Sequence, residues 1–494
     1  MLIEDTKIKF SALNYSKIMS PLKTLCLVAI ILLDPLGLVT ATNQASSNFI
    51  DRIKSVYYSN YGQHNVVVIF IDDEFLRNTN ETWPLSYQQQ AVLYRRALSL
   101  KPQALFIDLI FAQDRSEEGD ELYKLNALFR DYHSKFNIKT FLADLDSANS
   151  TSQFLNNYPY KGLVAWSGYK NQYPLLKGNQ KTAAFILYQE YCKNFGCNFD
   201  PFYFQQPLHV QWGFNFSDKQ QYFTKTSNCK PKESITNSLT NLFISDMFWR
   251  FQEDKFIQNC PYTLTIPASL LLSRDEQVKK SLKKALTNKI VLIGASIDGA
   301  KDLVHSPVHG KIAGVFYHAM ALDNLISYRE NYTRMAPEVF YQYNVLEIFE
   351  ILLVLYIWYF KKRILHQRNS DENYEGNSKM NSVVPSNESS QGSRKGSPEE
   401  KSPNNSVNIG HAISDPQEEA VHWIIFNDLR WKTLKKHRAY PMILTILLIL
   451  FITVCFMIFT NYGTINFIGL LLLSISLTIE FLFKPMVFSN PEQG

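Results

Sequence analysis

The sequence predicts an α/β domain with a mainly parallel sheet, attached to α-helical membrane segments, one before the domain and three after it. Three short segments predict the sheet: Val66–Asp73, Ala104–Phe111 and Lys289–Gly294. Their apolar residues are β-branched and continuous rather than alternating, which is typical of parallel strands covered on both faces. Between the first two, Tyr87–Leu100 contains good helix formers and is followed by Pro102, so it predicts a crossover helix.

Four apolar runs predict the membrane segments. They cover residues 25–40, 341–360, 441–460 and 465–483. The basic residues that flank these runs all fall on one side of a four-helix arrangement, which indicates the cytoplasmic side. The predicted organisation is a cytoplasmic leader (1–24), an exported domain (41–340), a cytoplasmic loop (361–440) and a cytoplasmic tail (484–494). A signal peptide cleaved near residues 39–41 is the alternative for the first run.

The loop at 361–440 divides into two kinds of sequence. Residues 369–415 contain no Leu, Phe or Trp and are rich in Ser, Asn, Pro, Gly and Glu, which predicts disorder. Residues 418–438 interleave apolar and basic side chains, which suits a helix lying on anionic lipid. A helix that docks on a partner protein is the alternative.

Four of the six cysteines lie in the predicted exported part, namely Cys192, Cys197, Cys229 and Cys260. An even number in an oxidising compartment suggests two disulfides, and three pairings are open. A zinc site is the less favoured alternative, because Cys192 and Cys197 lack a second close pair. The formal charge of +5 is small for 494 residues and the basic residues are scattered, so nothing indicates binding to nucleic acid.

Polar residues follow the predicted strands at their carboxyl ends. Asp72, Asp73, Asp108 and Gly294 are expected to cluster at these carboxyl ends, which is where open α/β sheets tend to bind ligands. The alternative is that these acids cap the helices that follow the strands.

The order of the motifs resembles the sensory CHASE domain of type 2, from about residue 32 to residue 327. An anchor ending in LLDPLGL is followed by VVVIFIDDEFL, by a Trp-Pro pair, by ALFIDLIF and by KIVLIGASIDGAKDLVHSPVHGKIAGVFYHA. The resemblance marks Trp83, Pro84, Gly294, Pro307 and Gly314 as structural motif residues. It also adds Asp302 and His318 to the three acids as candidate ligand-binding residues.

The resemblance implies an α/β input domain outside the inner membrane of a bacterium, in a multi-pass protein. In that family the domain is usually coupled to a cytoplasmic nucleotide cyclase or kinase, but here only Lys484–Gly494 follows the last predicted helix. No catalytic signature appears in the chain. We therefore expect a sensor that is not itself an enzyme, with no cofactor and no metal.

The expected partners are the lipid bilayer, an unknown extracytoplasmic ligand, a cyclase or kinase in trans, and a second copy in a homodimer. Two rival functions stay open at this point. One is an exported, membrane-anchored enzyme that uses Asp72, Asp73 and Asp108. The other is a remnant with a structural role in the envelope.

Overall fold

The structure is a computed structural model. It describes residues 34, 37–111, 115–116, 119–145, 154, 157–166, 172–197, 200–230, 257–298, 302–334, 338–340, 343–356, 359, 363, 439–463 and 465–472. Outside these residues lie the predicted leader, residues 369–415 for which disorder is predicted, residues 418–438 and the predicted tail. The chain divides into two units, Met1–Ile348 with Thr453–Gly469, and Phe349–Ile452 with Leu470–Gly494.

The first unit is built on a six-stranded sheet in the order β4-β3-β2-β8-β1-β7, in which every neighbouring pair is parallel. The strands are β1 (Val66–Asp72), β2 (Ala104–Ile110), β3 (Lys139–Leu145), β4 (Lys161–Ala165), β7 (Leu264–Pro267) and β8 (Ile290–Ser296). The predicted parallel α/β domain is thus confirmed, and its three predicted strands are β1, β2 and β8. Strand β3 and the shorter β4 and β7 were not predicted.

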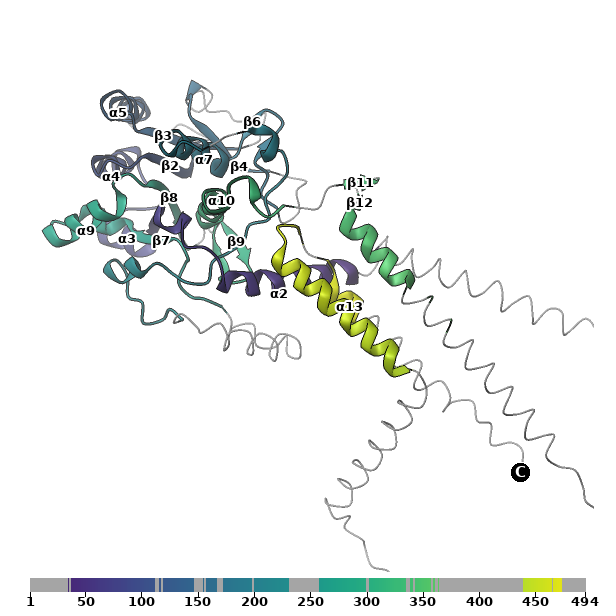
Figure 1. Ribbon diagram of the computed structural model, residues 1–494. Coiled ribbons are helices and arrows are strands. Elements are labelled where there is room, and N and C mark those ends of the chain that lie inside the picture. Colours follow the sequence, from purple (N-terminus) through teal and green to yellow (C-terminus); the bar gives the residue numbers. More distant parts are fainter. Residues whose placement is uncertain are drawn as a thin grey trace, which may run out of the picture. The chain divides into compact units, whose positions relative to one another are not determined.

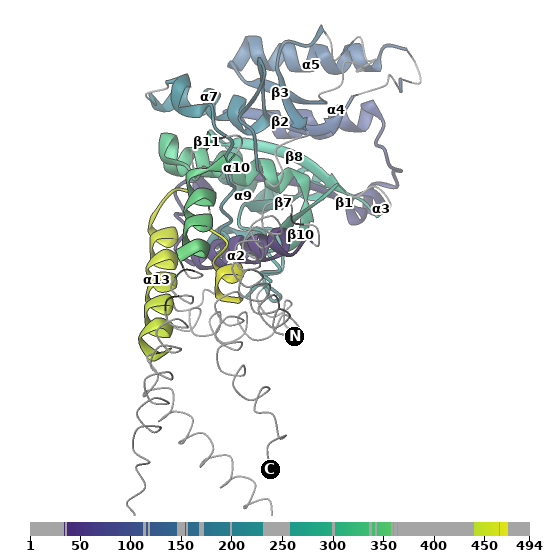
Figure 2. The ribbon, with the colours of Figure 1, turned by 90° about the vertical axis from the view of Figure 1, so that its right-hand side faces the viewer.

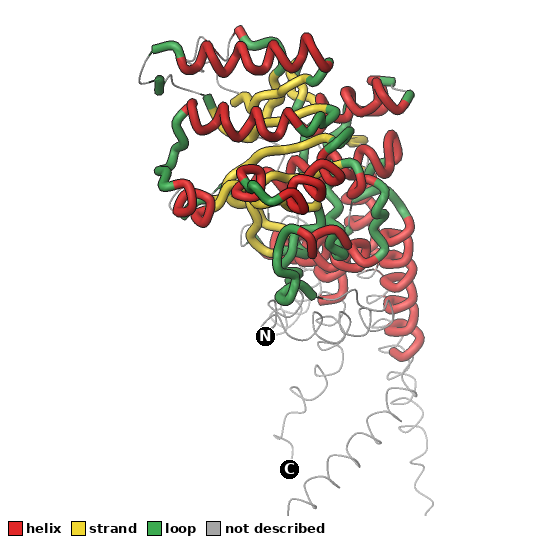
Figure 3. Tube along the Cα trace, turned by 90° about the vertical axis from the view of Figure 1, so that its left-hand side faces the viewer, coloured by secondary structure: helices red, strands yellow, loops and turns green. Residues whose placement is uncertain are grey.

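Helices cover both faces of the sheet (Figures 1 and 3). One face packs against α3 (Asp73–Thr79), α4 (Tyr87–Ser99), α5 (Glu121–Phe136) and α9 (Glu276–Leu286). The other packs against α7 (Ala183–Phe195) and α10 (Gly314–Tyr328). Alternate residues of β1 serve the two sides: Val66 and Val68 face α10, while Val67 and Ile69 face the opposite layer, and all four are buried. The predicted crossover helix is α4.

The helices start and end where their sequences supply caps. Ser86 accepts a hydrogen bond from the backbone N–H of Gln89 at the start of α4, and Asp275 does the same for Gln277 at the start of α9. Asn137 follows the last residue of α5 and Gly196 that of α7, and both adopt the left-handed conformation that closes a helix. These local signals fix the helices that cover the sheet.

Helix α2 (Leu38–Val56) lies across the end of the domain opposite α5, as Figure 2 shows. The smaller elements of this unit are η1 (Gly62–His64), β5 (Leu176–Lys177), β6 (Gln180–Lys181), η2 (Pro201–Phe204), η3 (Asp218–Tyr222), η5 (Ala268–Leu272), β9 (Leu303–Ser306), β10 (Gly310–Ala313), η6 (Arg329–Asn331), β11 (Glu338–Phe340) and β12 (Tyr343–Asn344). The pairs β5–β6, β9–β10 and β11–β12 are antiparallel.

The second unit is described over helical residues 349–356 and the first part of α13 (Ala439–Phe459). Among the residues that the structure describes, no helix meets the combined length and apolarity that a membrane crossing needs. The predicted runs at 25–40, 341–360 and 465–483 fall partly outside those residues. The four membrane segments therefore remain predictions.

Candidate functional site

Three of the candidate residues come together beneath the first turns of α10. Asp108 points from β2 toward His318 of α10, with Asp108 Oδ1 3.9 Å from His318 Nε2. Asp302 lies close enough to add its charge to the environment of Asp108. On the other side of the imidazole, the hydroxyl of Tyr173 lies 2.8 Å from His318 Nδ1.

Hydrogen bonds hold the Tyr173 hydroxyl against the imidazole of His318. The hydroxyl oxygen of Tyr173 accepts a hydrogen bond from the backbone N–H of Ala184 at 3.0 Å, so its own hydrogen is free to be donated to His318 Nδ1. Nε2 points toward Asp108, at a distance too long for a hydrogen bond. Burial lowers the pKa of His318 to about 3, so the ring is neutral.

Asp108 titrates in a different range from an ordinary carboxyl group. Burial, and then the negative charge of Asp302, raise the pKa of Asp108 to about 7. A buried group that is half protonated near neutral pH suits proton exchange or ligand contact as well as a structural role. The structure brings Asp108, Asp302 and His318 into one region, and their binding role stays a prediction.

Asp72 and Asp73 occupy a different place in the sheet edge. Asp72 caps α3, because its carboxylate accepts a hydrogen bond from the backbone N–H of Phe75 at 2.8 Å. The carboxylate of Asp73 accepts the backbone N–H of Asp298 at 3.2 Å. The capping alternative that the sequence left open therefore holds for Asp72, because the chain turns into α3 directly after β1. Asp73 instead holds the loop after β8, and a ligand-binding role for the three acids stays a prediction.

A second polar group lies where α2 meets residues distant in the chain; we call it the α2 junction (Thr42, Asp51, Lys54, His209, Arg334, Thr460, Asn461, Gly463 and Asn466). His209 Nε2 lies 2.8 Å from Asp51 Oδ1. Lys54 donates to the backbone oxygen of Thr460 at 3.0 Å, and Asn466 donates to the hydroxyl of Thr42 at 2.8 Å.

The junction also contains backbone pairing. Arg334 donates its N–H to the oxygen of Asn461 at 3.0 Å, and Gly463 donates to the oxygen of Arg334 at 2.9 Å. His209 is tied to the same segment, since its N–H donates to the oxygen of Thr333 at 2.8 Å. Residues 38–56, 209, 333–334 and 460–466 thus form one hydrogen-bonded group.

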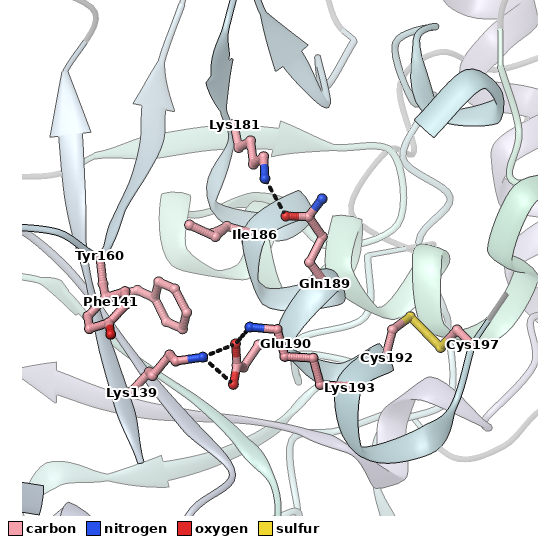
Figure 4. Close-up of a pocket in the computed structure, with 10 residues that line it drawn as sticks. All are labelled: Lys139, Phe141, Tyr160, Lys181, Ile186, Gln189, Glu190, Cys192, Lys193 and Cys197. Atoms are coloured by element: carbon pink, nitrogen blue, oxygen red, sulfur yellow. Dashed lines mark hydrogen bonds and ion pairs between the residues drawn. A yellow bond between two sulfur atoms is a disulfide. The ribbon is translucent and has the colours of Figure 1, made fainter. Parts of the chain in front are cut away.

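A cleft of about 550 Å³ lies between the β3–β4 side of the sheet and α7 (Figure 4). Glu190 of α7 stands at its centre, with Lys139 Nζ at 2.9 Å and Lys193 Nζ at 2.8 Å from its Oε2. Lys181 of β6 donates to the side-chain oxygen of Gln189 of α7 at 2.8 Å. Burial raises the pKa of Glu190, but hydrogen bonds from the two lysines outweigh it and hold the pKa below its ordinary value.

Among models of protein families, that of the CHASE2 domain matches residues 24–359 of the chain. The chain belongs to the CHASE2 domain family. CHASE2 is a sensory domain family, which is compatible with a role other than catalysis. No curated protein and no solved structure shows significant similarity to the chain.

The CHASE2 motif residues have packing reasons in this structure. A Cβ on Gly294 would overlap the side chain of Val315, so glycine lets α10 approach β8. A Cβ on Gly314 would overlap the carboxylate of Asp302, which sits at the N-terminus of α10, where a negative charge is favourable. Pro307 accepts the Arg52 side-chain Nε–H on its backbone oxygen at 2.9 Å, which links α2 to the motif.

The Trp83–Pro84 pair precedes α4 and has a cis peptide bond. Trp83 packs against the hydrophobic layer that contains α4. Two disulfides, Cys192–Cys197 and Cys229–Cys260, give one of the three pairings that the sequence left open. Within the described residues, no three His, Cys, Asp or Glu side chains are grouped as a metal site would require.

Sequence reasoning missed three parts of these sites: Tyr173, the Asp51–His209 pair and the lysines around Glu190. Asp51 and His209 are 158 residues apart, and no local pattern connects them. The spacing of Glu190 and Lys193 is the one signal that could have been found, because residues three apart on a helix are neighbours. Nothing in the sequence joins Lys139 to that pair.

Proposed function

We propose that this CHASE2 protein is a membrane-anchored sensor that detects an extracytoplasmic stimulus with its α/β domain and passes it to a separate cytoplasmic partner. The α2 junction is the single observation that carries this proposal. It brings together the helix that follows the first apolar run, the segment before the second run, and the turn between the third and fourth runs.

The junction suits transmission for a geometric reason. Residues 461–463 connect the third and fourth predicted membrane runs. Their backbone pairs with that of Arg334, which precedes the second predicted run. A rearrangement of the domain that shifts α2 or residues 333–334 would act on the ends of these runs at once. Their meeting on the domain also supports the predicted topology, in which the turn at 461–463 and the domain share one side of the membrane.

The exposed side chains of α13 support membrane anchoring. Phe451 is 66% exposed and Phe459 86% exposed, and Leu444, Leu447, Leu448, Ile452 and Phe456 are also exposed. Contiguous apolar surface of this kind marks contact with lipid or with another protein. The position of this helix within the predicted third run favours lipid.

Labelling of introduced cysteines tests the topology. In a Cys26→Ala/Cys455→Ala background, Tyr462→Cys should react with an impermeant maleimide in intact cells, because Tyr462 is 43% exposed in the turn. The matched variant Ser397→Cys, in the predicted cytoplasmic loop, should react after permeabilisation only. Equal labelling of both positions in intact cells would contradict the proposed topology.

Crosslinking in cells tests the partner. The full-length protein is crosslinked, purified in detergent and analysed by mass spectrometry, beside a variant lacking residues 369–438. We expect a nucleotide cyclase or a kinase to be recovered with the full chain and lost with the deletion. Recovery of envelope components alone, with both proteins, would contradict signalling to a cytoplasmic partner.

The pKa of Asp108 supports the exported-enzyme alternative, since a carboxyl that titrates near 7 suits acid–base chemistry. Asp72 and Asp73 offer it less support, because both accept backbone N–H groups. Under this alternative, Asp108→Asn would abolish a measurable turnover. Under the sensor proposal it would alter the response to the stimulus alone.

A further inference from the structure

The cleft beside α7 carries more positive than negative charge. Lys139, Lys181 and Lys193 line it with Glu190 as the acidic residue, so the lining has a net charge of about +2. Figure 4 shows both Lys139 and Lys193 directed at the single carboxylate from opposite sides. One carboxylate therefore neutralises two ammonium groups incompletely.

The Lys139–Glu190 pair is buried, whereas Lys193, which brings the excess charge, is 59% exposed at the mouth of the cleft. The side chains of Lys139 and Glu190 are 16% and 11% exposed, so water stabilises their charges poorly. The pKa of Lys139 is accordingly lowered by burial and by the neighbouring Lys193, in spite of Glu190. A second negative group beside the two ammonium groups would offset the repulsion between Lys139 and Lys193.

The walls of the cleft are apolar beside the charged groups. Phe141 and Tyr160 meet edge to face, with ring centroids 5.8 Å apart, and Ile186 of α7 lines the cleft as well. The Cys192–Cys197 disulfide closes the region after the end of α7. Pockets with an apolar lining and a few convergent polar groups commonly bind small molecules, and about 550 Å³ is within their usual size range.

We propose that this cleft binds a small organic anion, whose negative group lies between Lys193 and Lys139 and whose apolar body packs against Tyr160. This inference rests on the proposed sensory function and names the class of its stimulus. The cleft has a connection to the buried core, because Ala184 at the start of the same helix donates to Tyr173, the partner of His318. Occupation of the cleft thus acts on a helix that contacts α10.

Calorimetric titration of the full-length protein in non-ionic detergent tests this proposal. Phenyl phosphate and benzoate are the anionic probes, and benzyl alcohol is the neutral probe with the same ring. We expect saturable binding of at least one anion and none of benzyl alcohol, and the two anions distinguish a phosphate from a carboxylate ligand. Inorganic phosphate should bind more weakly than phenyl phosphate, because it cannot use the aromatic wall.

Three variants locate the binding. Lys193→Gln should weaken the anion about tenfold, the usual effect of losing a hydrogen bond from a charged group. Lys279→Gln is the matched control, because Lys279 pairs with Glu276 at the same helical spacing but lies on α9. Glu190→Gln should tighten binding, since it removes the carboxylate that competes with the ligand for both lysines.

Several results would overturn the inference. These are the absence of saturable binding of either anion to the wild type, equal effects of Lys193→Gln and Lys279→Gln, or weaker binding to a folded Glu190→Gln variant. Thermal unfolding of each variant establishes that it is folded, and Lys193→Gln, on a side chain that is 59% exposed, decides the question if Glu190→Gln is not folded. The titration depends neither on the membrane topology nor on a partner protein. Its failure would therefore overturn the anion site alone, while the labelling and crosslinking experiments would still test the proposed function.

Discussion

His209 and Asp51 form a largely buried pair that ties α2 to the segment around Thr333. Nε2 of His209 lies 2.8 Å and 3.0 Å from the two carboxylate oxygens of Asp51, and the side chains are 17% and 7% exposed. Burial lowers the pKa of His209, but the charge and hydrogen bond of Asp51 outweigh burial and the nearby Lys54, so the pKa is raised. The pair is strongest when His209 is protonated.

This relationship predicts a pH-dependent contribution to stability. A histidine whose pKa is raised in the folded state stabilises the fold fully below its unfolded pKa, about 6.5, and loses that contribution as pH rises through the folded value. His209→Gln should therefore lower the melting temperature more at about pH 5.5 than at about pH 9. Thermal unfolding of both proteins across this range measures the difference. A difference that does not change with pH would contradict the assignment.

Asp108→Asn should stabilise the protein at alkaline pH. The pKa of Asp108 is raised from 3.8 to about 7. The wild type therefore loses stability as pH rises between these values, because the folded state must then hold an ionised carboxyl group in a buried place. A shift of about three pKa units corresponds to at most about 4 kcal/mol in the free energy of unfolding. Denaturant unfolding near pH 8 should show a gain that is absent near pH 4. The control Asp131→Asn, on the exposed surface of α5, should show no gain in stability at either pH.

Tyr173→Phe should destabilise the domain by about 1–3 kcal/mol. The change removes the hydroxyl that accepts from Ala184 and pairs with His318, and it leaves two buried polar groups without that partner. Chemical denaturation measures the loss. Tyr123→Phe is the control, because Tyr123 is 67% exposed on α5 and its loss of a hydroxyl should have no measurable effect. Equal stabilities of the two variants would show that the buried hydroxyl has no energetic role.

Gly294→Ala should destabilise the fold by about 1–3 kcal/mol through overpacking. The new methyl group would overlap the side chain of Val315, which is 2% exposed and has little room to move. The double variant Gly294→Ala/Val315→Ala should recover part of the loss, because it removes the atoms that clash. Strict additivity of the two single changes in denaturant unfolding would rule out the contact as the cause.

Much of the fold could be predicted from local patterns. The continuous apolar segments gave β1, β2 and β8, and helix formers between Ser86 and Pro102 gave α4. The short β4 and β7 were missed because they have four or five residues and no distinctive pattern. Strand order was not predictable either: β8 inserts between β1 and β2, although it comes last of the six in the chain.

The candidate site divides in the same way. Asp108, Asp302 and His318 were proposed from the sequence, and the structure places them around one point. Tyr173, which orients His318, was not, because a tyrosine in a loop has no pattern that reports its partner. Asp72 carried the same sequence signal as Asp108, but the turn into α3 makes it a cap.

The sequence by itself determined the class of domain, the strands at the centre of its sheet, the apolar runs around it and its resemblance to a sensory family, because periodicity and ordered motifs are properties of neighbouring residues. The tertiary structure alone decided which polar side chains find which partners: His209 contacts Asp51, Lys54 donates to the backbone oxygen of Thr460, and Lys139 contacts Glu190. Those pairs join residues from 51 to 406 positions apart. Packing of the helices on the sheet brings them together, and no local pattern records that packing.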